Sequence, residues 1–153
     1  MGWKIVVGAD DAGFAYKEVL REVLEADARV DEVIDIGVDA AGTTPYPRIA
    51  AEAATRVARG DADRALLVCG TGLGVAIAAN KVKGIRAVTA HDSYSVERSV
   101  LSNNAQVLTM GARVVGIELA KKLVGEWLEH RFDPASPSAQ KVALIERSEE
   151  CES

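Results

Sequence analysis

The chain has 153 residues, of which 48% are hydrophobic, and its formal net charge at pH 7 is −5. This length suits a single domain with its own core, spanning residues 1–153. The mild acidity, with no long run of basic residues, excludes nucleic acid and an anionic membrane surface as expected partners.

The first residues, "MGWKIVVGADD", are too short and too acidic for a signal peptide, and no apolar stretch approaches the length needed to span a membrane. Cys69 follows an apolar run and Cys151 lies in a polar tail, so a disulfide is not expected. Two histidines without clustered cysteines predict no metal site. We therefore expect a cytoplasmic protein.

Short apolar runs alternate with segments of helical spacing along the whole chain. Strands are expected at 4–9, 32–37, 65–69, 85–90 and 106–110, and helices at 14–26, 46–60, 75–82, 93–104, 116–132 and 136–150. The last helix is expected to fray from about residue 147. Strands and helices that alternate through short links pair in parallel with right-handed crossovers. The predicted fold class is α/β, a three-layer α/β/α Rossmann-like sandwich on a parallel sheet of about five strands, with a C-terminal helix.

Open parallel sheets bind ligands at the carboxyl ends of their strands. In this chain that edge is expected to carry four segments that are polar or rich in glycine: 10–13, 69–74, 91–92 and 111–113. Most of the chemically unusual residues therefore belong to one edge of the predicted sheet.

The segment "CGTGLG" follows the third expected strand and opens a helix, so its backbone N–H groups suit a phosphate, a carboxylate or an oxyanion. Gly70, Gly72 and Gly74 alternate, whereas a dinucleotide fingerprint has its third glycine one position later, where Val75 stands. A phosphate-binding loop would end in Gly-Lys-Ser/Thr, which is missing. Glycines at such a corner also occur only because they permit positive φ angles.

Cys69 has two interpretations. A buried intracellular cysteine is commonly a small hydrophobic residue. Here it ends a strand on the ligand edge, and the helix that begins after it would stabilise a thiolate. A nucleophilic hydrolase would pair the thiol with a histidine such as His91, but the order of residues matches no protease or amidase pattern.

Together these segments resemble a known family. The stretches "GADDAGF", "YP" at 46–47, "CGTGLGVAIAANKVKGIRA" and "HDSYSVERSVLSNNAQVLTMGARVVGIELAKKLV" occur in the order found in the type B ribose-5-phosphate isomerase and galactose-6-phosphate isomerase family. The similarity runs from about Lys4 to Val142.

This resemblance implies a Rossmann-like aldose–ketose isomerase of sugar phosphates that uses no metal and no cofactor, and a homodimer or homotetramer whose subunits share their active sites. Cys69 corresponds to the family's base, with Thr71 as a catalytic helper, and the amides of 70–74 correspond to the cradle for the enediolate oxygen. Relatives without the cysteine use a glutamate at the position of Val75. The resemblance and the edge rule together predict these substrate-binding residues: Asp10, Asp11, Tyr46, Gly70, Gly72, Gly74, His91, Ser102, Asn103, Arg113 and Lys141.

Three departures from the family pattern concern the substrate. Asp11 stands where a histidine is usual, and Ser102 stands where ribose-phosphate isomerases have the histidine that opens the furanose ring. The C-terminal arginines that bind phosphate are missing, which leaves Lys141, with Arg48 as a further candidate cation.

A four-carbon ketose phosphorylated on its terminal hydroxyl cannot close a furanose, so it needs no ring-opening residue. An erythrulose 4-phosphate/erythrose 4-phosphate pair and a ribulose 5-phosphate/ribose 5-phosphate pair are therefore both candidate substrates, the second requiring Asp11 or Ser102 with a water to open the ring. Two other classes are considered: a sugar-phosphate-binding subunit that is inactive without a partner chain, and a dinucleotide-dependent dehydrogenase, which the glycine spacing disfavours.

Overall fold

A computed structural model describes residues 1–37 and 44–150. Its strands are β1 (Trp3–Ala9), β2 (Val30–Asp35), β3 (Arg64–Cys69), β4 (Ala87–Thr89) and β5 (Val107–Gly111). Its helices are α1 (Phe14–Ala26), α2 (Tyr46–Ala58), α3 (Leu73–Ala79), α4 (Ser93–Leu101), α5 (Ile117–Glu129) and α6 (Ser138–Glu150). No helix in these described ranges is long and apolar enough to cross a membrane.

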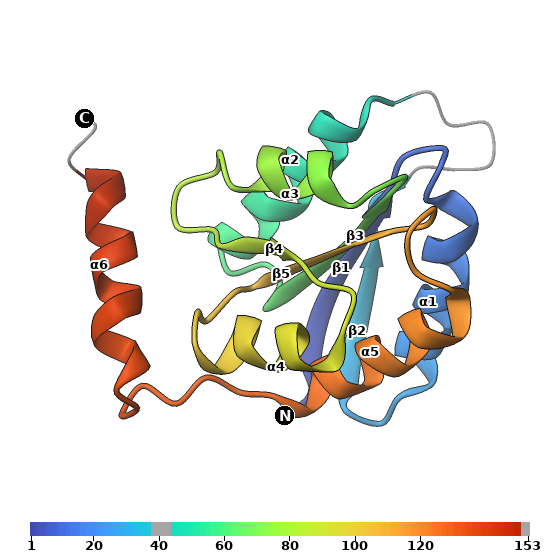
Figure 1. Cartoon of the computed structure of the whole chain (residues 1–153). Helices are drawn as coiled ribbons and strands as arrows, with labels where there is room; N and C mark the ends of the chain where they lie inside the picture. Colours follow the sequence, from blue (N-terminus) through green and yellow to red (C-terminus); the bar gives the residue numbers. More distant parts are fainter. Residues whose placement is uncertain (38–43, 151–153) are drawn as a thin grey trace.

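The strands form one parallel sheet in the order β2-β1-β3-β5-β4, which confirms the predicted α/β class (Figure 1). The chain therefore moves outward from β1 to β2, returns past β1 to β3, and later inserts β5 between β3 and β4. The connections that follow β1 and β2 lead to opposite sides of β1, and ligands bind at the carboxyl ends of the strands at such a switch point in folds of this kind.

Helices cover both faces of the sheet and make it a three-layer sandwich. On one face α1, α4 and α5 pack over a core that includes Leu20, Val96 and Trp127. On the other face α2 and α3 pack over a second core that includes Ala53 and Val75. Because β3 and β5 are buried throughout, the turns that follow them are attached to strands in the packed core.

The helix starts lie at the carboxyl edge of the sheet and have local causes. Pro47 follows Tyr46 in the first turn of α2, where a missing N–H costs nothing. Asp92 caps α4, since its carboxylate accepts the Ser95 N–H at 2.7 Å. Gly72 precedes α3 with a φ of 81°, a left-handed conformation that suits glycine.

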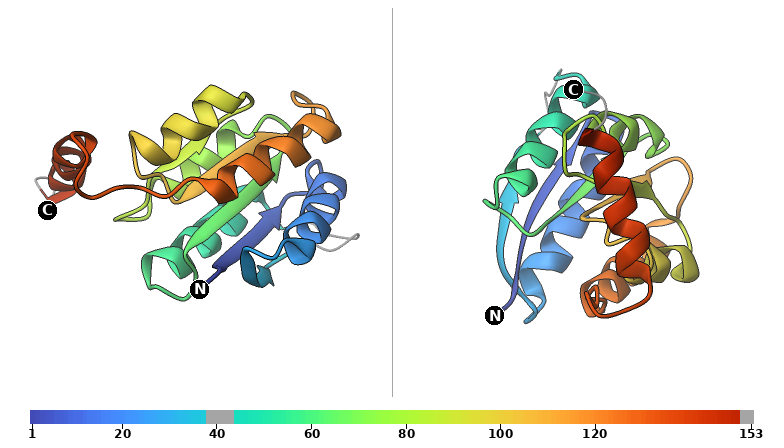
Figure 2. Two further views of the ribbon diagram at one scale, coloured as in Figure 1. Left: turned by 90° about the horizontal axis from the view of Figure 1, so that it is seen from below. Right: turned by 90° about the vertical axis from the view of Figure 1, so that its left-hand side faces the viewer.

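The C-terminal helix α6 stands away from the sandwich at the end of an extended linker (Figure 2). Its links to the body include a hydrogen bond from the Gly84 N–H to Glu149 and an ion pair between Glu146 and Arg86 at 3.2 Å. Helical geometry extends through Glu150. Leu144 and Ile145 are 58% and 45% exposed, so this helix carries apolar surface that the chain itself leaves uncovered.

Candidate active site

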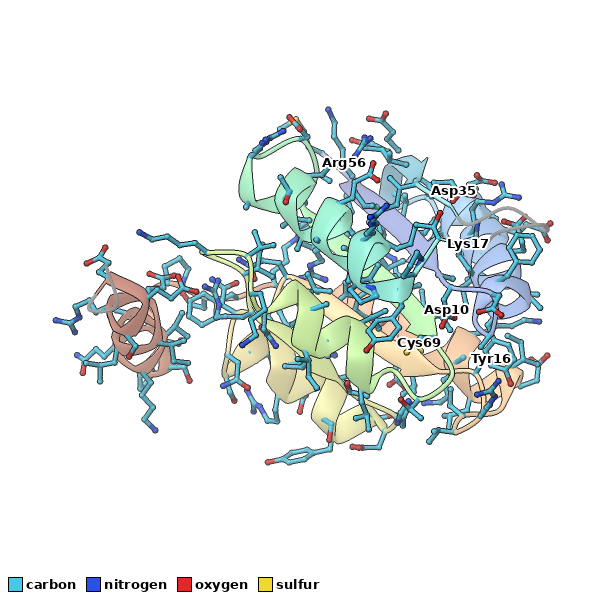
Figure 3. The ribbon with its side chains drawn as sticks, turned by 90° about the horizontal axis from the view of Figure 1, so that it is seen from above. Asp10, Tyr16, Lys17, Asp35, Arg56 and Cys69 are labelled. Carbon is cyan, nitrogen blue, oxygen red and sulfur yellow. The ribbon has the colours of Figure 1, made fainter. Side chains whose placement is uncertain are left out.

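Asp10 and Cys69 come together at the carboxyl edge of the sheet. β1 and β3 are neighbours in which Ala9 pairs with Val68, so the residues that follow lie side by side (Figure 3). The Asp10 carboxylate accepts the Gly13 N–H at 2.9 Å and thereby fixes the turn into α1. Asp11, next to it, is exposed.

The Cys69 sulfur sits at the bottom of the site. It is 5% exposed, and its Sγ accepts a hydrogen bond from the Gly72 N–H at 3.1 Å. A hydrogen bond donated to sulfur stabilises the negatively charged form of the thiol more than the neutral form. The end of β3 and the glycine turn thus hold the sulfur in a fixed place at the carboxyl edge of the sheet.

Two turns pack backbone against backbone beside this sulfur. A Cβ on Gly72 would lie 2.8 Å from the Met110 carbonyl carbon, and a Cβ on Gly111 would lie 2.5 Å from that of Thr71. Neither position has room for a side chain, because the obstructing atoms are main chain. The alternating glycines therefore serve close packing as well as the left-handed φ at position 72.

The rim of the site carries a ring, a cation and a hydroxyl. The Tyr46 ring lies on Gly74, so that a Cβ at position 74 would come within 2.6 Å of the ring. The Arg113 guanidinium lies on Gly70, so that a Cβ at position 70 would be 2.9 Å from Nη1. The exposed Thr71 accepts the Leu73 N–H through its Oγ1 at 3.2 Å, which leaves its own hydroxyl proton to donate elsewhere.

The glycine turn also offers main-chain donors. Among residues 1–37 and 44–150, no hydrogen-bond partner is found for the N–H of Thr71 or of Gly74. With the Arg113 guanidinium alongside, these amides can hold an oxyanion and a phosphate. Val75 points into the core beneath, fully buried, so the position of the relatives' glutamate contributes no acid. In the described ranges, no three His, Cys, Asp or Glu side chains gather as a metal site would require.

His91 reaches the same edge, and its ring bonds to the main chain of the turn after β5. Its Nε2 accepts the Gly111 N–H at 2.9 Å, which places the proton of the neutral ring on Nδ1. Burial lowers the pKa of His91 below its ordinary 6.5, and the Asp92 carboxylate opposes part of that shift. Since Nε2 is engaged with Gly111, the Cys69–His91 pair that a hydrolase would need is not formed.

Protonation of His91 is therefore expected to destabilise the turn at Gly111. Because the folded pKa is depressed, the unfolded chain binds the proton first, so this contribution is complete above pH 6.5 and is lost as the pH falls through the lower folded value. We expect the protein to lose about 1 kcal/mol more stability between about pH 7 and pH 5 than His91→Gln, which does not titrate. Urea unfolding at the two pH values measures this, and equal losses would contradict it.

Ser102 and Asn103 do not join this site within one chain. They follow α4 and precede β5, whose first residue, Val107, pairs with Ala65 at the start of β3. At roughly 3.3 Å per residue, β5 alone puts more than about 13 Å between them and the carboxyl edge. Lys141 belongs to α6, a helix that stands apart from the sheet that contains β3 (Figure 1).

Comparisons with known proteins agree with this geometry. The sequence profile of the Ribose/Galactose Isomerase family matches residues 5–145. The chain belongs to this family. It is 71% identical over 143 residues to D-erythrulose-4-phosphate isomerase 2 of Mycolicibacterium smegmatis, covering 93% of this chain and 94% of that protein.

Two further family members extend the comparison. Ribose-5-phosphate isomerase B of Escherichia coli is 44% identical over 131 residues, covering 85% of this chain and 86% of the relative. The structure of ribose-5-phosphate isomerase B from Clostridium thermocellum superposes with a TM-score of 0.92 at 38% identity, covering 98% and 99% of the two chains. The fold and the relation to sugar-phosphate isomerases predicted from the sequence are thus confirmed.

Several residues with buried polar contacts near this edge were not predicted from the sequence. Lys17 is 2% exposed and pairs with Asp35 at 2.9 Å, which ties α1 to the end of β2 beside the site (Figure 3). Thr89 and Thr109 lie in the sheet and contact the glycine turn. A lysine in an otherwise apolar helix face and polar residues in apolar strands were the available signals.

Proposed function

We propose that this chain isomerises a small sugar phosphate between its ketose and aldose forms, with Cys69 as the base. The observation that carries the proposal is the Cys69 sulfur, which ends β3, accepts the Gly72 N–H and lies beside main-chain donors and a guanidinium. A base, an oxyanion cradle and a cation are the three groups that this reaction requires.

The reaction needs one proton to move between neighbouring carbons. The Cys69 thiolate takes a proton from C1 of the ketose, and the electron pair left behind forms the C1–C2 double bond as the C2 carbonyl oxygen becomes an oxyanion. The amides of Thr71 and Gly74 and the Thr71 hydroxyl stabilise this enediolate. Return of the proton from sulfur to C2, with transfer of the hydroxyl proton from O1 to O2, gives the aldose.

Substrate orientation follows from the groups on the rim. Asp10 and Asp11 suit sugar hydroxyls, because carboxylates accept hydrogen bonds from them. Arg113 suits the phosphate, because a guanidinium presents several donors to its oxygens, and the exposed Arg48 in the first turn of α2 is a second candidate. Tyr46, 41% exposed, would cover the bound sugar from one side.

We further propose that the active unit is a homodimer or a higher homo-oligomer in which each site is completed by a second copy. Ser102 and Asn103 are too far from Cys69 to act in the same chain, and Lys141 belongs to a helix that stands apart from the sheet (Figure 1), whereas a partner related by a twofold axis would bring its own set to this edge. Exposed apolar side chains support such contact. Leu73 and Ile77 on α3 are 57% and 63% exposed, and Leu144 and Ile145 on α6 are 58% and 45% exposed. The phosphorylated substrate supports the sequence-based expectation of a cytoplasmic location.

For the sugar, we propose erythrulose 4-phosphate and erythrose 4-phosphate. Ser102 cannot act as an imidazole acid or base, and an open-chain tetrulose phosphate needs no ring opening. The 71% identity to an enzyme named for D-erythrulose 4-phosphate supports the same choice. The pentose pair remains the second candidate because the Escherichia coli relative is named for it.

A substrate panel on the purified protein tests this proposal. We expect kcat/KM for erythrulose 4-phosphate to exceed that for ribulose 5-phosphate and ribose 5-phosphate, with no requirement for NAD. Ser102→His is expected to raise turnover of cyclic ribose 5-phosphate by about tenfold or more, since it returns an imidazole acid–base. Ser102→Asn, which is polar but does not titrate, is the matched control. A parent enzyme that prefers the pentose would refute the tetrose assignment.

A further inference from the structure

Two threonines from neighbouring strands contact the main-chain carbonyl oxygen of Gly72. Thr109 Oγ1 on β5 lies 2.7 Å from the Gly72 oxygen and Thr89 Oγ1 on β4 lies 3.0 Å from it. The two residues are register partners, and their hydroxyl oxygens are 2.8 Å apart. On its other side, Gly72 donates its N–H to the Cys69 sulfur.

The proton count allows only two of these three contacts to be hydrogen bonds at one time. Two hydroxyls own two protons, yet three close contacts join the two oxygens and the carbonyl. The shortest contact assigns the Thr109 proton to the Gly72 oxygen, and the Thr89 proton then serves Thr109. Hydrogen bonds in such a chain polarise one another, so Thr89 strengthens the bond that Thr109 makes.

The glycine turn needs this support. Gly72 has a φ of 81°, and its carbonyl is 3.4 Å from the Ala76 N–H, a long first bond for α3. The hydrogen bond from α3 thus holds the Gly72 carbonyl weakly. On the side of the sheet, the hydroxyl of the fully buried Thr109 is the closest group to the Gly72 carbonyl oxygen and holds it by a hydrogen bond.

We propose that Thr109, backed by Thr89, is a positioning residue that keeps the Gly72 N–H directed at the Cys69 sulfur and thereby sets how readily this thiol forms its thiolate. Thr109 is fully buried, so it acts on the thiol through Gly72. The effect of the two threonines on the thiol does not depend on which sugar is turned over. Their effect on the reaction rate rests on the proposed function.

The experiment compares Thr89→Val, Thr109→Val and the double variant, which remove hydroxyls with little change of shape. After Thr109→Val, Thr89 can turn its proton directly to Gly72, so each single variant should have a smaller effect than the double variant. Thr109→Ser keeps the hydroxyl and should behave as the parent does. Ser99→Ala is the matched control, since it removes another buried hydroxyl, one that donates to the Val96 carbonyl within α4.

The first readout is the pH titration of the Cys69 thiolate by its ultraviolet absorbance, in a Cys151→Ser background. For the double variant we expect the midpoint to move upward by about one pH unit, which is a tenfold smaller thiolate fraction below the midpoint. The acid limb of kcat/KM should move in the same direction. An unchanged thiolate midpoint in a folded double variant would overturn the proposal. A shifted midpoint in a protein that isomerises none of the sugars would instead overturn the proposed function.

Discussion

Cys69→Ser is expected to reduce isomerisation by about 10²- to 10⁴-fold, the range that a positioned base typically contributes. The serine hydroxyl has nearly the shape of the thiol and can still accept the Gly72 N–H, so the turn should stay in place. It cannot hold a negative charge near neutral pH, and the proton at C1 therefore has no acceptor. Initial rates with erythrulose 4-phosphate measure the loss.

The fold and the chemistry are separated by two controls. Circular dichroism and the melting temperature of Cys69→Ser should match those of the parent, since the exchange is nearly isosteric. In deuterated water the parent should place solvent deuterium on the carbon that receives the proton, and the variant should not. Near-normal turnover would assign the base to another residue at this edge, with Asp10, Asp11 and His91 the next candidates.

The layer architecture was predictable because it depends on periodicities that are local in sequence. The apolar spacing through Leu20 and Leu24 indicated α1, and the β-branched run ending at Ala9 indicated β1. The insertion of β5 between β3 and β4 was not predictable, because all crossovers in such a sheet are right-handed and satisfy local rules whichever neighbour the strand joins. The separate position of α6 likewise depends on contacts beyond its own sequence.

The location of the site was predictable for a different reason. Parallel strands end at one edge, so Asp10, Cys69 and Arg113 could be grouped before their contacts were known. The same reasoning could not place Ser102 and Asn103, which come from the far end of β5. Only the family resemblance included them, through the positions that match the family's motif.

The hydrogen-bond partners of the side chains were the least predictable feature. The hydrogen bond that the His91 ring accepts from the Gly111 N–H could not be predicted, because nothing in the local sequence of His91 indicates it. In the sequence Thr109 is simply one polar residue in an apolar strand, and its meaning depends on a register pairing with Thr89 twenty residues earlier in the chain. Side-chain networks of this kind are set by tertiary packing, which sequence periodicity does not encode.

Two inactive variants of this chain should restore activity when they are combined in one oligomer. Cys69→Ser removes the base from one edge of the sheet, and Asn103→Ala removes the amide at the opposite edge, which is expected to bind substrate oxygens. Each homogeneous variant should be impaired, the second by about a hundredfold, as is typical when a donor to a developing oxyanion is lost.

In a mixed dimer the defects separate if the site is shared. One site then carries both substitutions, Cys69→Ser from one chain and Asn103→Ala from its partner, and is inactive. The other site combines the intact Cys69 of one chain with the intact Asn103 of the other. Random reassortment makes about half of the dimers mixed, each with one working site of two, so the mixture should recover about a quarter of the parent activity. Co-expression with two affinity tags isolates the mixed species.

The matched control combines Cys69→Ser with Arg113→Ala. Both residues lie at the same edge of one chain, since Arg113 packs on Gly70 directly after Cys69. Every site in that mixed dimer carries one defect, so no activity should return. Recovery only in the Cys69/Asn103 mixture would establish that Asn103 acts across the interface, because a general stabilising effect of mixing would rescue both combinations. If neither mixture recovers while light scattering finds a dimer, the second copy does not complete this site.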